Sequence, residues 1–407
     1  MLCRHCSTSL QQTFLDLGFA PPSNAYLDER DLVRPETYFP LRVMVCDQCW
    51  LVQTQDYTEA EQLFDDSYAY FSSVSQSWLD HARRYTNTIV DRLRLTANSS
   101  VVEIASNDGY LLKNFLSRGI PCLGIEPTSG TAAAARELGI PVVEEFFGVD
   151  LAHELVKREG KADLIIGNNV FAHVPDINDF AQGLMVLLES GGTVTLEFPH
   201  LMRLLECNQF DTVYHEHFSY LSLGAVNRIL AAAELRLFDV EELSTHGGSL
   251  RVFACHHSDP RSVKPEVERV LTRERQAGLE KLSTYQGFQQ RADSVKNDLL
   301  DYLISQKREG KTVAAYGAAA KGNTLLNYAG IKPDLIKYVC DGAASKQGKF
   351  MPGSHIPIHP PSMLQQDVPD AVLILPWNIA DEIKANTKGR VPDDCSFVTA
   401  VPRLRTL

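Results

Sequence analysis

The spacing of hydrophobic positions changes along the chain, and each spacing predicts a different kind of element. Between residues 77 and 93, apolar side chains recur every three or four positions, as on one face of a helix. Short apolar runs then alternate with segments of helical spacing. The runs that predict strands are 101–104, 122–126, 163–167 and 193–198, and the predicted helices between them are 110–118, 130–138 and 178–188. Such alternation is typical of a parallel, doubly wound sheet, so we expect a central Rossmann-like α/β domain.

Two further regions flank this centre. The first 75 residues are loop-rich, which predicts a small lobe with little core of its own. Residues 262–308 are charged and weakly apolar, so we expect helices that lead to a third, also Rossmann-like domain. The apolar runs that repeat the α/β pattern there are 312–316, 336–340 and 371–375. The fold class is therefore α/β, and the predicted domains are 1–75, 76–262 and 263–407.

The composition narrows the class of protein. With 407 residues the chain is long enough for two or three domains of about 150 residues each. Its 44% hydrophobic and 22% charged residues are typical of soluble globular proteins, and no run of about 18 apolar residues occurs, so a cytoplasmic protein without membrane contact is expected. A net charge of −12 without a dense basic stretch argues against a nucleic-acid partner.

Four of the nine cysteines form two close pairs, Cys3 with Cys6 and Cys46 with Cys49. Two residues between paired cysteines is the spacing at which both thiolates occupy corners of one tetrahedron around zinc. Four sulfur ligands leave no open position for water, so the predicted zinc is structural. The alternative is that both pairs are reduced cysteines of the core.

Three loops that follow predicted strands carry polar or acidic residues. The first contains Glu103, Ala105, Asn107, Asp108 and Gly109, the second begins at Glu126, and the third contains Asn168. In a doubly wound sheet these loops meet at one edge, where backbone amides bind a nucleoside ligand and a carboxylate binds its ribose. The first loop lacks the three spaced glycines of a dinucleotide site, and its acidic surroundings favour a cationic nucleoside such as S-adenosylmethionine. The alternative for this loop is a purely structural turn.

The segment Tyr214-His215-Glu216-His217 concentrates titratable and aromatic side chains, which are costly to bury unless they pair with each other or with a ligand. A histidine beside a carboxylate is suited to act as a general base, and a tyrosine is suited to donate a hydrogen bond to a developing oxyanion. We therefore predict a catalytic segment. The alternatives are a surface loop with structural histidines and a metal site formed by His215 and His217.

A small-residue loop with one lysine opens the third domain. It runs from Tyr316 to Asn323, between a predicted strand and the start of a helix, and it contains Lys321. Backbone amides and one ammonium group form an anion site that suits the diphosphate of a nucleotide. Close packing of the helix explains the small residues equally well. Asp341 and Trp377, which follow later strands, are candidates for ligand contact, or for a helix cap and a core position.

Together, several of these motifs resemble one enzyme family. The segments that carry the resemblance are the cysteine pairs, Asp16-Leu17-Gly18 with Pro22-Ser23-Asn24, Tyr68 to Ser73, the loop 103–109, Glu197 to His200, Tyr214 to Phe218, and Tyr316 to Gly322. Over its whole length the chain resembles the sugar C-methyltransferases that act on nucleotide-linked 4-keto-deoxyhexoses. One departure is Ala105, where the family usually has glycine.

The resemblance implies methyl transfer from S-adenosylmethionine to carbon 3 of a 4-keto-6-deoxyhexose linked to dTDP, GDP or CDP. It implies that His217 removes the carbon 3 proton to give an enolate. Tyr214, Glu216 and Tyr68 would orient this base or the sugar. The residues that the resemblance assigns to contacts with the sugar or its nucleotide are Asn169, His173, Tyr70, Lys321 and Asn323.

Three other functions are compatible with parts of the sequence. An O- or N-methyltransferase needs a base near a hydroxyl or an amine but no keto sugar. A zinc-ribbon binding module without activity is disfavoured by the acidic charge, and a nicotinamide-dependent reductase by the missing three-glycine fingerprint. We expect the C-methyltransferase, acting as a monomer on a small-molecule substrate.

Overall fold

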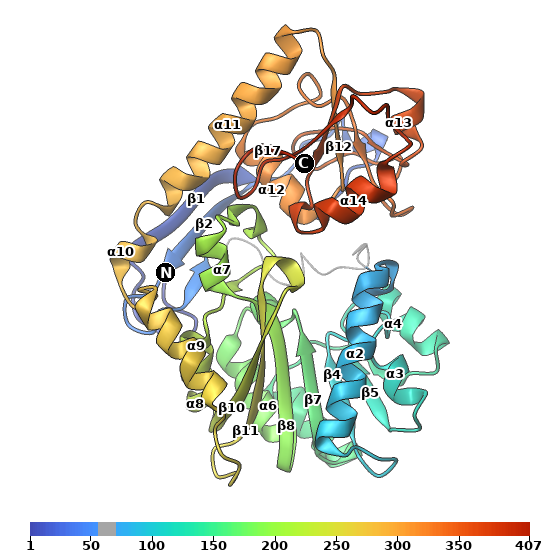
Figure 1. Cartoon of the computed structure of the whole chain (residues 1–407). Helices are drawn as coiled ribbons and strands as arrows, with labels where there is room; N and C mark the ends of the chain where they lie inside the picture. Colours follow the sequence, from blue (N-terminus) through green and yellow to red (C-terminus); the bar gives the residue numbers. More distant parts are fainter. Residues whose placement is uncertain (56–70) are drawn as a thin grey trace.

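The computed structural model describes residues 1–55 and 71–407, which form an amino-terminal lobe, a central α/β domain and a carboxy-terminal α/β domain (Figure 1). Strand β1 (Gln12–Ala20) of the lobe runs beside helix α11 (Phe288–Arg308), which leads into the carboxy-terminal domain. In the part of the chain that the structure describes, no helix has both the length and the apolar character needed to cross a membrane.

The central domain is built on a seven-stranded sheet. Its order is β10 (Leu235–Leu243), β11 (Ser249–His256), β8 (Leu188–Pro199), β7 (Ala162–Asn168), β4 (Val101–Ile104), β5 (Cys122–Ile125) and β6 (Val142–Val143). Strands β4 to β8 pair in parallel, as predicted, and β4 lies between β5 and β7, so the loops after these three strands share one edge. The antiparallel hairpin β10–β11 extends the predicted parallel sheet into a mixed one. Only residues 244–248 connect its strands, too few for a parallel crossover.

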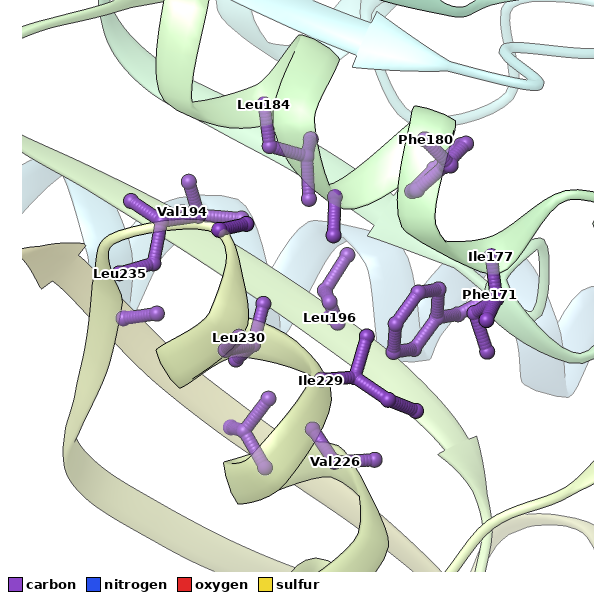
Figure 2. Packing of buried hydrophobic residues seen from close by; sticks show 14 of the residues in the cluster. Phe171, Ile177, Phe180, Leu184, Val194, Leu196, Val226, Ile229, Leu230 and Leu235 are labelled. Carbon is purple, nitrogen blue, oxygen red and sulfur yellow. The ribbon is translucent and has the colours of Figure 1, made fainter. Parts of the chain in front are cut away.

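Helices cover both faces of this sheet. They are α2 (Gln76–Leu93), α3 (Lys113–Leu116), α4 (Ser129–Glu137), α5 (Val149–Glu159), α6 (Ile177–Leu187), α8 (Leu223–Ala232) and α9 (Pro265–Gln276). Helix α7 (Leu201–Glu206) packs instead in the core that the lobe shares with α11. Successive residues of β7 face opposite ways: Leu164 and Ile166 pack in the cluster that includes α2, and Ile165 in the cluster that includes α6 and α8. Figure 2 shows the second cluster, in which Phe180 of α6, Leu196 of β8 and Ile229 of α8 pack together.

The amino-terminal lobe contains an antiparallel sheet that the central domain completes. Its order is β1, β2 (Phe39–Val45), β3 (Val52–Thr54) and β9 (Ser219–Tyr220). Strand β9 begins two residues after His217, so the lobe is joined to the histidine-rich segment by backbone pairing. The lobe also shares a core with α11, where the rings of Phe14 and Phe288 stack at 4.7 Å.

The carboxy-terminal domain repeats the parallel plan. Its strand order is β14 (Ile358–His359), β13 (Val339–Cys340), β12 (Val313–Tyr316), β15 (Ala371–Ile374), β16 (Ser396–Thr399) and β17 (Arg405–Thr406). Its helices are α12 (Ala320–Tyr328), α13 (Met363–Gln366) and α14 (Ala380–Thr387), and α10 (Leu282–Tyr285) precedes α11. Strand β12 lies between β13 and β15 just as β4 lies between β5 and β7, which confirms a second Rossmann-like unit.

Candidate active site

The loop after β4 turns sharply because three of its residues have left-handed backbones: Ala105 (φ 57°), Asn107 (φ 49°) and Gly109 (φ 77°). A Cβ atom at residue 109 would lie 2.5 Å from Cδ1 of Ile140, so this position needs glycine. The carboxylate of Glu126, after β5, holds the loop, since its Oε2 accepts a hydrogen bond from the amide of Asn107 at 2.9 Å. Two of the three predicted loops therefore meet.

Three carboxyl groups gather at this edge. Burial raises the pKa of Glu103 on β4 well above its usual value, and the charges of Asp108 and Glu126 add to this effect. Oδ2 of Asp108 accepts a hydrogen bond from the amide of Ser73 at 3.0 Å, whereas its buried Oδ1 has no partner among the described residues. A buried acceptor without a partner fits a ligand with N–H or O–H groups, and the acidic edge fits a positively charged one. The residues present therefore fit S-adenosylmethionine.

The segment before α2 and the first turn of this helix cover the same loop. The amide of Ser72 donates to Oδ1 of Asn107 at 2.9 Å. The ring of Trp78 stacks on that of Tyr110, with 5.9 Å between centroids, and lies 5.4 Å from the ring of His246. The loop after β4 is thus covered by the residues that precede and begin α2.

A short 3₁₀ helix, η4 (Phe210–Thr212), precedes the histidine-rich segment and orients His217. Nδ1 of His217 lies 2.9 Å from the carbonyl oxygen of Thr212, so Nδ1 carries the proton and donates, and Nε2 keeps a lone pair. The His217 ring lies 3.9 Å from that of Tyr214 and 4.6 Å from that of His173. Burial, and then the neighbouring His173, lowers the pKa of His217 well below its usual value. The neutral ring has the form that a general base needs.

The amino-terminal lobe binds the carboxylate of Glu216. Nδ2 of Asn24 donates to Oε1 at 2.8 Å and to Oε2 at 2.9 Å. Burial raises the pKa of Glu216 to about 7, against the opposing effects of the Asn24 hydrogen bond and the positive charge of Lys346. The carbonyl of Thr212, and not Glu216, is the group bonded to the ring of His217.

The third predicted loop, after β7, meets a residue that sequence reasoning missed. Oδ1 of Asn168 is buried without a partner among the described residues. Asn169 has a left-handed backbone (φ 54°), and its Nδ2 lies 3.3 Å from Nε2 of His246, in the turn between β10 and β11. The only signal in the sequence is the run His246-Gly247-Gly248 between two apolar stretches.

Lys321 reaches from the carboxy-terminal domain toward the central one. Its Nζ donates to Oδ1 of Asn378 at 2.7 Å and lies 4.8 Å from the centre of the Trp377 ring. Nε1 of Trp377 in turn donates to Oδ2 of Asp211 at 2.7 Å. The charge of Lys321 contributes to the low pKa of His217, so the two groups lie within electrostatic range.

The loop that carries Lys321 has a carboxylate partner of its own. Oδ2 of Asp341, after β13, accepts a hydrogen bond from the amide of Ala318 at 2.7 Å. Asp341 thus holds the place in the carboxy-terminal sheet that Glu126 holds in the central one. Nδ2 of Asn323 donates to the carbonyl oxygen of Ser23 at 2.5 Å, so this predicted ligand residue also fixes the lobe.

The four predicted metal ligands lie together. All four Sγ atoms are within 4.8 Å of one another, with 3.4 Å between Cys3 and Cys49 and 3.5 Å between Cys6 and Cys46. Thiolates at about 2.3 Å from zinc form a tetrahedron with edges of about 3.8 Å, so the cluster fits one zinc ion. Elsewhere in the described ranges, no three potential ligands come together, and a metal site at His215 and His217 has no third ligand there.

The predicted cofactor residues thus lie at the ends of β4, β5 and β7, and the histidine-rich segment lies beside the third of these ends. Lys321 joins them from the carboxy-terminal domain. Tyr68 and Tyr70 lie outside the described residues. The individual roles of the site residues stay predictions.

Three family models match the chain in succession. A zinc binding domain matches residues 3–64, a methyltransferase domain matches residues 78–240, and the C-methyltransferase C-terminal domain matches residues 244–402. The curated C-methyltransferase NovU from Streptomyces niveus is 36% identical over 405 residues, which are 100% of this chain and 96% of that protein.

Solved structures match the chain less closely. The PH0226 protein from Pyrococcus horikoshii is 13% identical over 49% of this chain and 100% of its own, with a TM-score of 0.39. Magnesium protoporphyrin IX methyltransferase from Synechocystis, with bound S-adenosylmethionine, is 13% identical over 49% of this chain and 99% of its own, with a TM-score of 0.36. Likeness at this level carries no argument about the chemistry.

Proposed function

Because this chain belongs to the S-adenosylmethionine-dependent C-methyltransferases with an amino-terminal zinc-binding domain, we propose that it methylates carbon 3 of a nucleotide-linked 4-keto-6-deoxyhexose. The proposed nucleotide is dTDP, ahead of GDP or CDP, and the product is a branched deoxysugar. The observation that carries the proposal is the neutral, oriented His217, since methylation beside a ketone requires a base for a carbon-bound proton.

In this proposal Nε2 of His217 removes the carbon 3 proton. The electron pair of the broken C–H bond forms a double bond between carbons 3 and 4, and the ketone oxygen gains negative charge. The carbonyl of Thr212 keeps its hydrogen bond to Nδ1 and so stabilises the imidazolium that forms. When bound, S-adenosylmethionine supplies an electrophilic methyl group on a sulfonium sulfur. The base and the cofactor loops are fixed before substrate arrives, which supports a reaction that depends on placement.

The carboxy-terminal domain is proposed to hold the nucleotide. The loop 316–323 offers backbone amides after a strand, and Asp341 offers a carboxylate at the strand end where ribose hydroxyls are bound in such sheets. Lys321, within electrostatic range of His217, is suited to the diphosphate that links nucleotide and sugar.

Glu126→Gln should weaken the binding of S-adenosylmethionine by about tenfold or more. A hydrogen bond to a charged group contributes about 1.5–3 kcal/mol, and the variant removes that charge from both the ribose contact and the bond to the Asn107 amide. Isothermal calorimetry measures the effect. Glu154→Gln, on the exposed side of α5, is the matched control and should bind as the wild type does. Wild-type affinity in Glu126→Gln would contradict the cofactor role.

The rate should also fall as the pH drops through about 7. The pKa of Glu216 is raised to about 7, chiefly by burial, so below this pH the group is a neutral carboxylic acid and no longer offers the carboxylate that is proposed to orient the base or the sugar. Because burial raises this pKa, protonation favours the folded lobe, and the fall is expected in the rate and not in the stability. Burial holds the pKa of His217 well below its usual value, so His217 is not expected to contribute this fall in rate. A pH profile of kcat/KM measures the limb, which Glu216→Gln should remove and Glu154→Gln should keep. A limb that persists in Glu216→Gln would assign it to another group.

The function itself is tested by incubating the enzyme with S-adenosylmethionine and 4-keto-6-deoxyhexoses linked to dTDP, GDP or CDP. Mass spectrometry should find one added methyl group, and NMR should place it on carbon 3. Without S-adenosylmethionine, the enzyme should exchange the carbon 3 hydrogen with deuterated water. A methyl group on oxygen or nitrogen, with no exchange, would replace the proposal with O- or N-methylation.

A further inference from the structure

His246 and Asn169 form a polar pair beside the site that the proposed mechanism has not used. Nδ2 of Asn169 lies 3.3 Å from Nε2 of His246. The His246 ring lies 5.4 Å from that of Trp78, which covers the cofactor loop, and the pKa of His217 is lowered in part by His246. The pair therefore lies between the predicted cofactor site and the predicted base.

Both members of the pair have left-handed backbones, with φ of 53° for His246 and 54° for Asn169. Few residues other than glycine adopt this region, asparagine and histidine more readily than most, and such conformations persist where the surroundings enforce them and gather at functional sites. Two such residues from loops far apart in the sequence meet here through one hydrogen bond. Local turn formation alone does not explain that meeting.

The turn that carries His246 is held on two sides. Oγ1 of Thr245 donates to Oε1 of Glu197 at the end of β8, at 3.0 Å. On the other side, a Cβ atom at Gly247 would lie 2.5 Å from Cη2 of Trp377, so the carboxy-terminal domain packs directly on the turn. His246 is thus positioned before any substrate binds.

The pair retains one N–H donor in either orientation of the Asn169 amide. If Nδ2 of Asn169 donates to Nε2 of His246, the ring proton is on Nδ1, which has no partner among the described residues. If the amide is reversed, Nε2–H donates to Oδ1, and Nδ2 of Asn169 is the remaining donor. Burial, and then the charge of Lys321, lowers the pKa of His246 to about 4, so the ring is neutral.

We propose that the His246–Asn169 pair donates a hydrogen bond to the ketone oxygen of the substrate and stabilises the negative charge that develops there. This inference rests on the proposed function. As Nε2 of His217 takes the proton, the C–H electron pair forms the new carbon–carbon double bond, and the carbonyl π pair moves to the oxygen that the donor binds. The step needs no further reactant. A neutral imidazole suits this role because it polarises a carbonyl without giving up its proton.

Two substitutions of residue 246 distinguish the loss of the hydrogen-bond donor from a change in the backbone of the turn. Glycine at 246 keeps the left-handed backbone and removes the ring, while asparagine tolerates that backbone and keeps an N–H donor. The readout is exchange of the carbon 3 hydrogen of a dTDP-linked 4-keto-6-deoxyhexose with deuterated water. We expect His246→Gly to slow exchange about 10²- to 10³-fold, the loss usual for one oxyanion donor, and His246→Asn to slow it far less. Both should bind S-adenosylmethionine as the wild type does.

His257→Asn, at an exposed histidine just after β11, is the control and should exchange at the wild-type rate. A wild type that fails to exchange would contradict the proposed function and not the pair. If the wild type exchanges and His246→Gly exchanges equally fast, the donor role is wrong. If His246→Gly loses affinity for S-adenosylmethionine by as large a factor as it loses exchange, the donor role is also wrong. If the glycine variant does not fold, a loss of about 10²-fold or more in a folded His246→Asn overturns the proposal.

Discussion

His217→Asn should lower the rate of methyl transfer by about 10²- to 10⁴-fold, the range that a positioned general base contributes. Asparagine keeps an amide N–H that can donate to the carbonyl of Thr212, 2.9 Å from Nδ1 in the wild type, but it has no basic nitrogen. Exchange of the carbon-bound hydrogen should fall equally. Binding of S-adenosylmethionine, measured by calorimetry, should stay unchanged, because the predicted cofactor residues lie on the loops after β4, β5 and β7.

Two comparisons make this result specific to the base. His153→Asn, at an exposed histidine of α5, should keep the wild-type rate. In His217→Gly, imidazole added to the buffer should restore part of the activity, because the missing base is then supplied from solution. Exchange at a rate near that of the wild type in His217→Asn would show that another group removes the proton. His173, with its ring 4.6 Å away, would then be the first candidate.

The parts of this fold that sequence could predict are those with local causes. The cysteine pairs were recognisable because two intervening residues already place both thiolates at neighbouring corners of a tetrahedron. The strands and loops of both α/β domains were recognisable because the spacing of apolar residues and the turn residues between elements are local properties of the sequence. The predicted helix 110–118 was too long. The turns that follow Gly109 continue to Leu112, so only the four residues of α3 are helical.

The parts that sequence could not predict are contacts between distant positions. Asn24 reaches Glu216 across 192 positions, and only the folded lobe brings them together. The carbonyl of Thr212 that orients His217 depends on the path of the backbone, which side-chain chemistry does not reveal. His246 has a left-handed backbone and lies in a turn on which Trp377 of the carboxy-terminal domain packs. The identity of the base was therefore easier to predict than its partners.

Cys46→Ser should remove zinc and lower the free energy of unfolding of the lobe by several kcal/mol. Structural zinc contributes about 10–16 kcal/mol in isolated zinc-finger peptides, and the variant leaves three thiolates and a buried hydroxyl where four thiolates fit one ion. Elemental analysis measures the metal, and denaturant unfolding measures the stability. Cys207→Ser is the matched control, because Cys207 lies outside the cluster in the central domain, and it should keep both.

The effect of Cys46→Ser on activity should come from unfolding of the lobe and not from a change in the methyl-transfer reaction itself. Strand β3 of the lobe pairs with β9, and Thr54 at the end of β3 donates a hydrogen bond to the backbone carbonyl of His217. Loss of zinc therefore loosens the scaffold of the base, so methyl transfer should decline over the same denaturant range in which the lobe unfolds. Where the variant remains folded, its rate should approach that of the wild type. One zinc per chain and wild-type unfolding in Cys46→Ser would contradict the structural role, and a lost rate in a fully folded variant would mean that the lobe acts in the reaction itself.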